Sequence, residues 1–171
     1  IAYVLASQEI SMGNKVYWVD GGSLLDPTRI ELLSLRDPLS YLDSLHACRA
    51  FTAHQMSEIF RRMERSGDGG TELQEDCLLI VTSAHSMFLD TQLGVAEGNM
   101  LLRNTLERIR RISRNRRLAV LMTIDRGHKP PTPAKVRSLL KKVSDEFLVM
   151  PLSTGKGQSP IDDHPSLSDF T

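Results

Sequence analysis

Five apolar residues run unbroken from Cys77 to Val81, and small polar residues follow them at once. A short apolar run of this kind is typical of a strand covered on both faces, as in a parallel sheet, because a half-exposed strand shows an alternating pattern. A second such run, Leu118–Thr123, follows after one long helical segment. The order strand, helix, strand indicates a right-handed parallel crossover. We therefore expect an α/β fold with a mostly parallel central sheet and helices on both faces.

Apolar spacing and turn residues place the other elements. We expect strands at 15–20, 44–51, 77–82, 118–123 and 147–152. Helices are expected at 1–10, 27–35, from Thr52 to Ser66, 99–117 and 134–143, and loops at 91–98 and 125–133. Two helices have start signals, an Asp26-Pro27 pair and a T-x-x-Q capping box at Thr52 and Gln55. The residues expected in the core of the sheet are Val19, Leu79, Ile80, Val120 and Leu121.

The chain has 171 residues, of which 40% are hydrophobic and 25% charged, and this composition is typical of one globular domain. We expect a core domain at 1–152 and a flexible C-terminal tail at 153–171, which is rich in Ser, Pro, Gly and Asp. No apolar run reaches the roughly 20 residues that span a bilayer, so no membrane partner is expected. The sequence opens at Ile1 without an initiator Met, and we expect it to be trimmed or processed there. No leader is visible, and Cys48 and Cys77 are expected to be reduced thiols, so an intracellular location is predicted, cytoplasmic in a prokaryote or nuclear in a eukaryote.

The net charge is zero, but the charges are unevenly distributed. Residues 1–102 contain 7 Lys and Arg against 14 Asp and Glu, whereas residues 103–142 contain 13 against 2, and residues 143–171 contain 1 against 5. Such asymmetry within one small domain indicates a surface for a polyanion or for an acidic protein partner. The arginines from Arg103 to Arg117 could instead form only the solvated face of an amphipathic helix.

Ligands of parallel α/β sheets bind at the carboxyl ends of the strands, which directs attention to Thr82, Ser83, Ile124 and Asp125. Asp20 ends another strand, where it could hold magnesium or simply cap the turn at Gly21-Gly22. The five histidines have no metal-ligand spacing, and no G-x-S-x-G motif supports a hydrolase triad. The sequence therefore predicts no metal site and no nucleophilic triad.

Three stretches resemble the core of RecA/RadA-type recombinases, the ATPases of homologous recombination. VYWVDGGSLLDPTRI is similar to the strand that ends in Asp-Thr-Glu-Gly in that family, and HACRAFTAHQM is similar to its Ala-Arg-Ala-Phe/Tyr segment. LLIVTS and LAVLMTID stand where the family has its Walker B strand and its Thr-Asn-Gln strand. The resemblance covers about residues 1–127 and implies a RecA-like P-loop NTPase core. It implies a weak nucleotide site at Asp20, Thr82 and Ser83.

The catalytic positions of the family are occupied by residues that cannot perform its chemistry. Its catalytic glutamate falls on Gly22, its Walker B aspartate on Thr82, and its Asn-Gln pair on Ile124 and Asp125. No G-x-x-x-x-G-K-[ST] motif occurs in the chain. Ile1 begins where the helix after a P-loop would. We therefore expect no catalytic residue, and we expect ATP and Mg²⁺ only if a P-loop lies upstream.

The family holds single-stranded DNA with two loops, which by position resemble 89–99 and 126–133. Only the second is basic here, so we expect DNA contact there and on the flanking helices. The residues expected to bind DNA are Arg126, His128, Lys129, Lys135, Arg137, Lys141, Lys142, Arg110 and Arg114. Residues 89–146 contain no Phe, Tyr or Trp, so binding should use phosphates and not base stacking.

The resemblance and the charge pattern together predict a recombinase paralogue that acts as a non-catalytic accessory in homologous recombination and DNA repair. Its expected partners are single- or double-stranded DNA and a recombinase or another paralogue subunit. Two alternatives stay open. One is an active DNA-dependent ATPase with a P-loop upstream of Ile1, and the other is a protein-interaction module without DNA contact.

Overall fold

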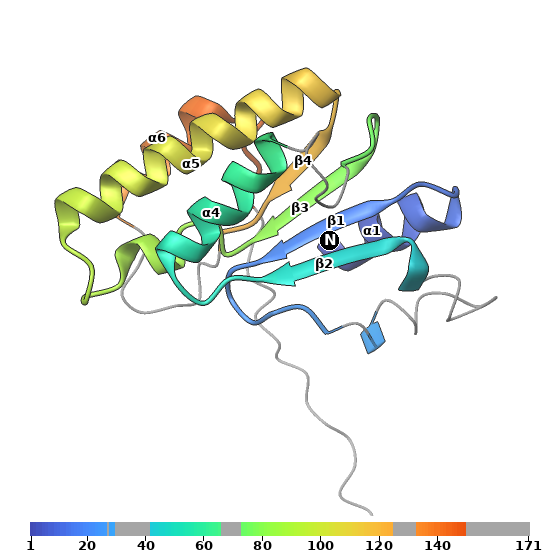
Figure 1. Cartoon of the computed structure of the whole chain (residues 1–171), viewed down its shortest axis with the longest axis horizontal. Helices are drawn as coiled ribbons and strands as arrows, with labels where there is room; N and C mark the ends of the chain where they lie inside the picture. Colours follow the sequence, from blue (N-terminus) through green and yellow to red (C-terminus); the bar gives the residue numbers. More distant parts are fainter. Residues whose placement is uncertain (27, 30–41, 66–72, 125–132, 150–171) are drawn as a thin grey trace, which may run out of the picture.

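A four-stranded parallel sheet forms the centre of the protein (Figure 1). The computed structural model describes residues 1–26, 28–29, 42–65, 73–124 and 133–149. The strands are β1 (Val16–Asp20), β2 (Leu45–Arg49), β3 (Leu78–Thr82) and β4 (Ala119–Met122), and they lie in the order β2-β1-β3-β4. All neighbours are parallel, and Asp20 is in register with both Arg49 and Thr82. The α/β class and four of the predicted strands are confirmed.

Helices cover both faces of the sheet, as expected (Figure 1). One face carries α1 (Ala2–Ser11), and the other carries α4 (Ala53–Glu64), α5 (Val95–Arg116) and α6 (Ala134–Val143). A short 3₁₀ helix, η1 (Ser86–Leu89), follows β3. None of the described helices is long and apolar enough to cross a membrane.

The alternation of side chains along the strands divides the core into two clusters. Trp18 and Ile80 point toward α1, whereas Val19 and Leu79 point toward the three helices on the other face. All four are buried. Val120 and Leu121 were also predicted in the core, but they are only half-buried because β4 has a single neighbouring strand in the described part of the sheet.

Two of the predicted helix starts have the expected hydrogen bonds. The Thr52 hydroxyl accepts from the backbone N–H of Gln55 at 3.1 Å, and the Gln55 side chain accepts from the N–H of Phe51. The Asp26 carboxylate accepts from the N–H of Thr28 at 3.1 Å. Each contact satisfies an N–H group that lacks a partner within the helix.

The structure differs from the predicted elements at two places. Helix α5 begins at Val95, so the second half of the predicted loop at 91–98 is helical. Gly98 then lies inside the helix and packs closely against η1, where any side chain would collide with the Phe88 carbonyl. The predicted strand at 147–152 is wrong for 147–149, which are not in a strand. Leu148 and Val149 are exposed there, so no face of this segment is buried along its length.

Several predictions fall on residues outside the described ranges. These include most of the helix expected at 27–35, nearly all of the basic loop at 125–133, and the tail at 153–171. Residues 28–29 are helical. The three DNA contacts predicted on Arg126, His128 and Lys129 and the family position on Asp125 also lie outside the described residues.

Candidate functional site

The carboxylate of Asp20 lies at the carboxyl end of β1 and is completely buried. Its Oδ1 accepts from the backbone N–H groups of Gly22 and Leu24 and from the Thr82 hydroxyl, at 3.2, 3.1 and 2.8 Å. Its Oδ2 accepts from the N–H of Leu25 and from Nε of Arg49, both at 3.0 Å. Five donors therefore occupy the roughly four lone-pair directions of the carboxylate.

The hydrogen bonds of Asp20 keep it charged in spite of its burial. Burial raises the pKa of a carboxyl group, but the N–H groups of Leu25 and Leu24, the Thr82 hydroxyl and the N–H of Gly22 outweigh this effect and lower the pKa of Asp20. The Arg49 guanidinium supplies a counter-charge and also donates to the Leu25 carbonyl at 3.1 Å. The carboxylate thus fastens residues 22–25 and the end of β2 to β1.

The two other residues of the predicted nucleotide site are buried beside Asp20. Thr82 accepts a hydrogen bond from the Trp18 indole N–H at 3.2 Å while it donates to Asp20. The Ser83 carbonyl accepts from the N–H of Ser86 at 3.2 Å, and the backbone of Ser83 has a positive φ of 49°. The structure brings Asp20, Thr82 and Ser83 together, as the sequence predicts, but it engages them with each other and with nearby backbone.

Gly22 lies in the turn that Asp20 caps, directly against Ser83. A Cβ atom at position 22 would overlap the Ser83 side chain, and one at Gly21 would lie 2.7 Å from the Met56 side chain. A glutamate at position 22 therefore cannot be accommodated without rearrangement of the turn.

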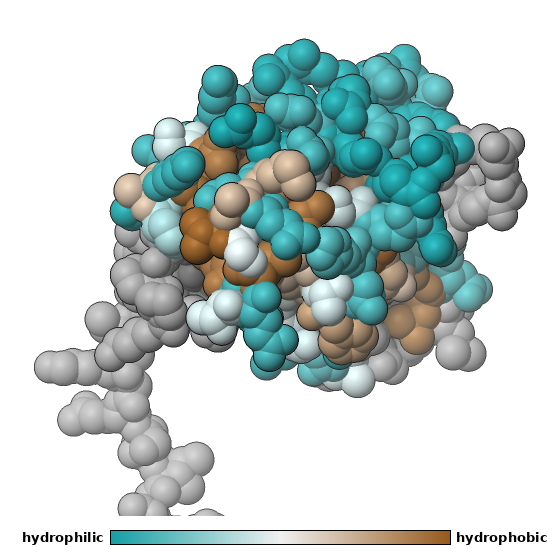
Figure 2. Space-filling view, turned by 60° about the vertical axis from the view of Figure 1, so that its left-hand side comes forward, coloured by the Kyte–Doolittle hydropathy of each residue, from teal (hydrophilic) through white to brown (hydrophobic). Residues whose placement is uncertain are grey.

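The same end of the sheet has exposed apolar surface. Figure 2 shows apolar side chains between hydrophilic ones on the side of the molecule at which α4 and α5 begin. Phe51 and Val95, at the starts of these helices, are 72% and 81% exposed.

Among the residues that the structure describes, no group of three or more His, Cys, Asp or Glu could hold a metal ion.

The arginines of α5 divide into two groups according to the side of the helix they occupy. Arg111 and Arg108 face α4, where they form ion pairs with Glu64 at 2.7 and 3.4 Å. Near the helix end, Arg116 donates to the Leu73 carbonyl, and Arg117, just beyond it, pairs with Glu75 and Asp76. These four arginines hold α5 to its neighbours and are not free cations.

The other group faces α6 and consists of Arg103, Arg110 and Arg114, which are all exposed. None of the three forms an ion pair with another residue in the described ranges. They are seven and four residues apart, which places them in one row on the same side of the helix. Arg110 and Arg114 are predicted DNA contacts, and the structure adds Arg103 to their row.

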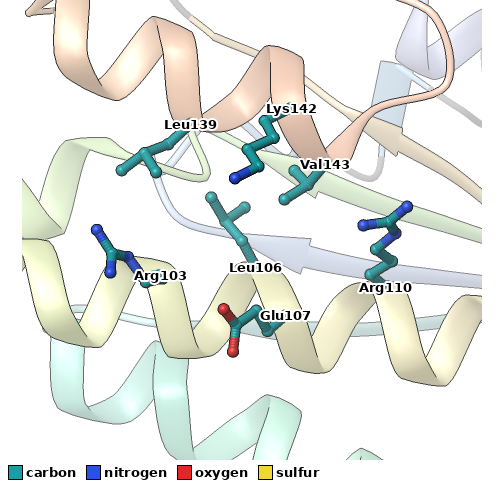
Figure 3. A pocket seen from close by; sticks show the side chains of 7 residues that line it. All are labelled: Arg103, Leu106, Glu107, Arg110, Leu139, Lys142 and Val143. Carbon is teal, nitrogen blue, oxygen red and sulfur yellow. The ribbon is translucent and has the colours of Figure 1, made fainter.

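A groove runs between α5 and α6, and Figure 3 shows its lining. Arg103 and Arg110 stand on either side of Leu106, and Lys142 points from α6 toward α5. The cavity has a volume of about 280 Å³. Its complete lining is Arg103, Leu106, Glu107, Arg110, Leu139, Lys142 and Val143. Cations therefore border an aliphatic floor.

The four predicted cations of α6 lie on two sides of the helix. Lys135 is seven residues before Lys142 and shares its groove side, because seven residues make almost two whole turns. Arg137 and Lys141 occupy the opposite side, where the Lys141 ammonium lies 5.2 Å from the centre of the Phe147 ring. The structure therefore brings Arg110 and Lys142 together at the groove, Arg114 and Lys135 follow on the same sides of their helices, and Arg137 and Lys141 lie on the other side of α6.

Sequence reasoning missed the groove and the ion pairs of Arg108, Arg111 and Arg117. The floor residues Leu106, Leu139 and Val143 were recognisable only as apolar positions of their helices, and Glu64 precedes its partner Arg111 by 47 residues.

No family model matches this chain, and no curated protein matches it.

Proposed function

We propose that the protein is a non-catalytic accessory of the RecA/RadA recombinase family, acting in homologous recombination and DNA repair, that binds DNA through its phosphates. The proposed surface is the α6 side of α5 together with the groove side of α6. The observation that carries the DNA-binding part is the row of Arg103, Arg110 and Arg114, which form no ion pair with a described residue, together with Lys142 across the groove from Arg103 and Arg110.

The side chains at the ends of β1 and β3 already have hydrogen-bond partners, and this supports the non-catalytic part of the proposal. A magnesium ion needs oxygen ligands that are free to coordinate it, and both oxygens of Asp20 already accept hydrogen bonds. Thr82 is engaged with Asp20 and Trp18, and the turn at Gly22 has no space for a side chain. The proposed role therefore requires neither ATP hydrolysis nor a bound metal at these residues.

Phosphate binding by this surface should be strong at low salt and weak at high salt, because it depends on counterion release from the nucleic acid. Contacts between these side chains and phosphates carry no sequence information by themselves. The DNA would be positioned against the protein for a second partner, and a recombinase or another paralogue subunit is the partner that we propose.

The experiment compares two double variants that each remove two positive charges and retain polar side chains. The first is Arg110→Gln with Lys142→Gln, on the groove. The second is Arg137→Gln with Lys141→Gln, on the opposite side of α6. Single-stranded DNA binding is measured by fluorescence anisotropy over a series of salt concentrations, and thermal unfolding checks that both variants are folded.

The groove double should bind about ten-fold more weakly than the parent, and the slope of log affinity against log salt should fall by about 1.4, since each phosphate contact with a single strand contributes about 0.7. The control double should change the affinity by about two-fold or less, because only long-range, screened attraction is lost. Equal losses in both doubles would show that the groove is not the binding surface. A parent protein that binds an acidic polypeptide but no DNA would favour the protein-interaction alternative.

A further inference from the structure

The groove between α5 and α6 offers more than positive charge. Leu106 forms its base and is only 2% exposed, while Leu139 and Val143 from α6 are half-buried. Glu107 is an exposed member of the same lining and has no ion pair with any described residue (Figure 3). These three side chains belong to the core between α5 and α6, and the half-buried Leu139 and Val143 leave an apolar surface beside the cations and Glu107.

We propose, on the basis of the function proposed above, that the groove binds one unstacked base of a single-stranded nucleic acid and that Glu107 favours a base with an exocyclic amino group. The base would lie against Leu139 and Val143, above the almost fully buried Leu106. The phosphates on its two sides would meet the cations of the rim.

The size of the groove agrees with one base. Pockets for drug-sized ligands have about 300–1000 Å³, and this cavity, at about 280 Å³, is at or below the lower limit of that range. It has room for a single flat ring system. The floor is aliphatic and the described lining has no aromatic residue, so contact with the base depends on burial of its faces and not on ring stacking.

The positions of the cations agree with a strand that passes over the groove. Arg103 and Arg110 are separated by seven residues, which is about 10 Å along the helix at 1.5 Å per residue. Figure 3 shows them on the two sides of Leu106, with Lys142 opposite. A phosphate can therefore be held on each side of a base that rests at the centre of the groove.

Glu107 makes a base a better occupant of the groove than the apolar side chain of an acidic peptide. An ionised carboxylate is an acceptor only, so its favourable partner carries N–H donors. The amino groups of cytosine and adenine are such donors, and carboxylates accept from cytosine N4 in known base readout. A leucine or phenylalanine anchor has no donor for Glu107. A duplex keeps its bases stacked, so none of them can lie on the floor of the groove, and the groove should prefer single strands.

The test uses two oligonucleotides that differ in the exocyclic group, dC12 and dU12, at neutral pH. Cytosine presents an amino group at the position where uracil presents a carbonyl oxygen. The parent protein should bind dC12 about five- to ten-fold more tightly than dU12, a ratio at the lower end of what one good base contact provides. A duplex of the same length should bind more weakly than dC12.

The key variant is Glu107→Gln, whose amide can both donate and accept. It should reduce the preference for dC12 to within about two-fold while the affinity for dU12 stays equal or rises, because an anion has been removed from the rim. Glu146→Gln is the matched control, since it removes the same charge from an exposed residue that is not in the groove lining. It should keep the full preference.

The outcomes separate this inference from the proposed function. Equal binding of dC12 and dU12 by the parent, or equal binding of duplex and single strand, would overturn the base site and leave phosphate binding intact. Failure to bind any oligonucleotide would overturn both proposals. Competition by CMP as effective as that by dC12 would overturn the role of the strand and identify a free nucleotide as the ligand.

Discussion

Replacement of Asp20 by alanine should lower the free energy of unfolding by about 3–5 kcal/mol. The substitution removes five hydrogen bonds from a completely buried carboxylate. Each buried donor that loses its partner costs about 1–3 kcal/mol. Water can reach part of this site, since Gly22 and Leu24 are exposed, so the sum over all five donors would be too large. We therefore count only two donors that stay shielded from water, the Thr82 hydroxyl and the Leu25 N–H, whose combined loss of about 2–6 kcal/mol agrees with the predicted range.

The matched control is Arg49→Gln, which breaks the ion pair and leaves the other four hydrogen bonds of Asp20 in place. The Arg49 side chain is 39% exposed, so solvent screens its charge, and its loss should cost only about 0.5–1 kcal/mol. Equilibrium unfolding in urea can be followed by the fluorescence of Trp18, the single tryptophan, which is hydrogen-bonded to Thr82 next to Asp20. A loss below about 1 kcal/mol for Asp20→Ala would refute the argument that this carboxylate organises the strand ends.

The pH dependence of the free energy of unfolding provides a second test of the contribution of Asp20. The pKa of Asp20 is lowered in the folded protein, so its stabilising contribution is fully present above the unfolded value of about 3.9. The contribution is lost as the pH falls through the folded value. The stability of the parent and of Asp20→Asn should therefore converge on acidification, and a difference that stayed constant down to pH 2 would contradict the lowered pKa.

Two further predictions follow from the sheet and its strand ends. Leu79→Ala should lower the free energy of unfolding by about 2–5 kcal/mol because the side chain is completely buried, and a loss below about 1 kcal/mol in urea unfolding would contradict its central position. The purified protein should hydrolyse no ATP above background, and Mg²⁺ should not raise the unfolding temperature, because Asp20 has no oxygen available for a metal. Magnesium-dependent turnover that is lost on mutation of Asp20 or Asp125 would show that the catalytic acids have been relocated and that the chain is an active ATPase.

The two central strands were predictable from sequence because a strand covered on both faces requires a local apolar run. The run at Leu78–Thr82 became a fully buried strand, as did Val16–Asp20. The run at Leu118–Thr123 has the same pattern, yet β4 is only partly buried. Whether a strand lies at the centre or the edge depends on its neighbours in the sheet, which are distant in the sequence.

The arginines of α5 also show that contacts with residues distant in the sequence cannot be predicted from a local pattern. Arg110 and Arg111 are adjacent in the sequence and have the same side chain, but one lines the groove and the other is paired with Glu64. Helical periodicity predicts that the two side chains point in different directions. It does not reveal that Glu64 of α4 lies on one side of the helix and α6 on the other. The charge pattern therefore predicted a basic segment correctly and could not identify which of its members are available for a ligand.

The position of β1 between β2 and β3 has a consequence for the way in which the chain folds. Asp20 and Thr82 are 62 residues apart, so β1 cannot gain its second neighbour until β3 has been synthesised. Contacts of such long range require the closure of large loops, and they slow folding relative to helical proteins of the same size. Until that closure, Trp18 and the apolar residues beside it are open to solvent and to other chains. A fully buried strand of the native protein thus lacks one of its neighbours during synthesis, which makes it prone to aggregation until β3 has emerged.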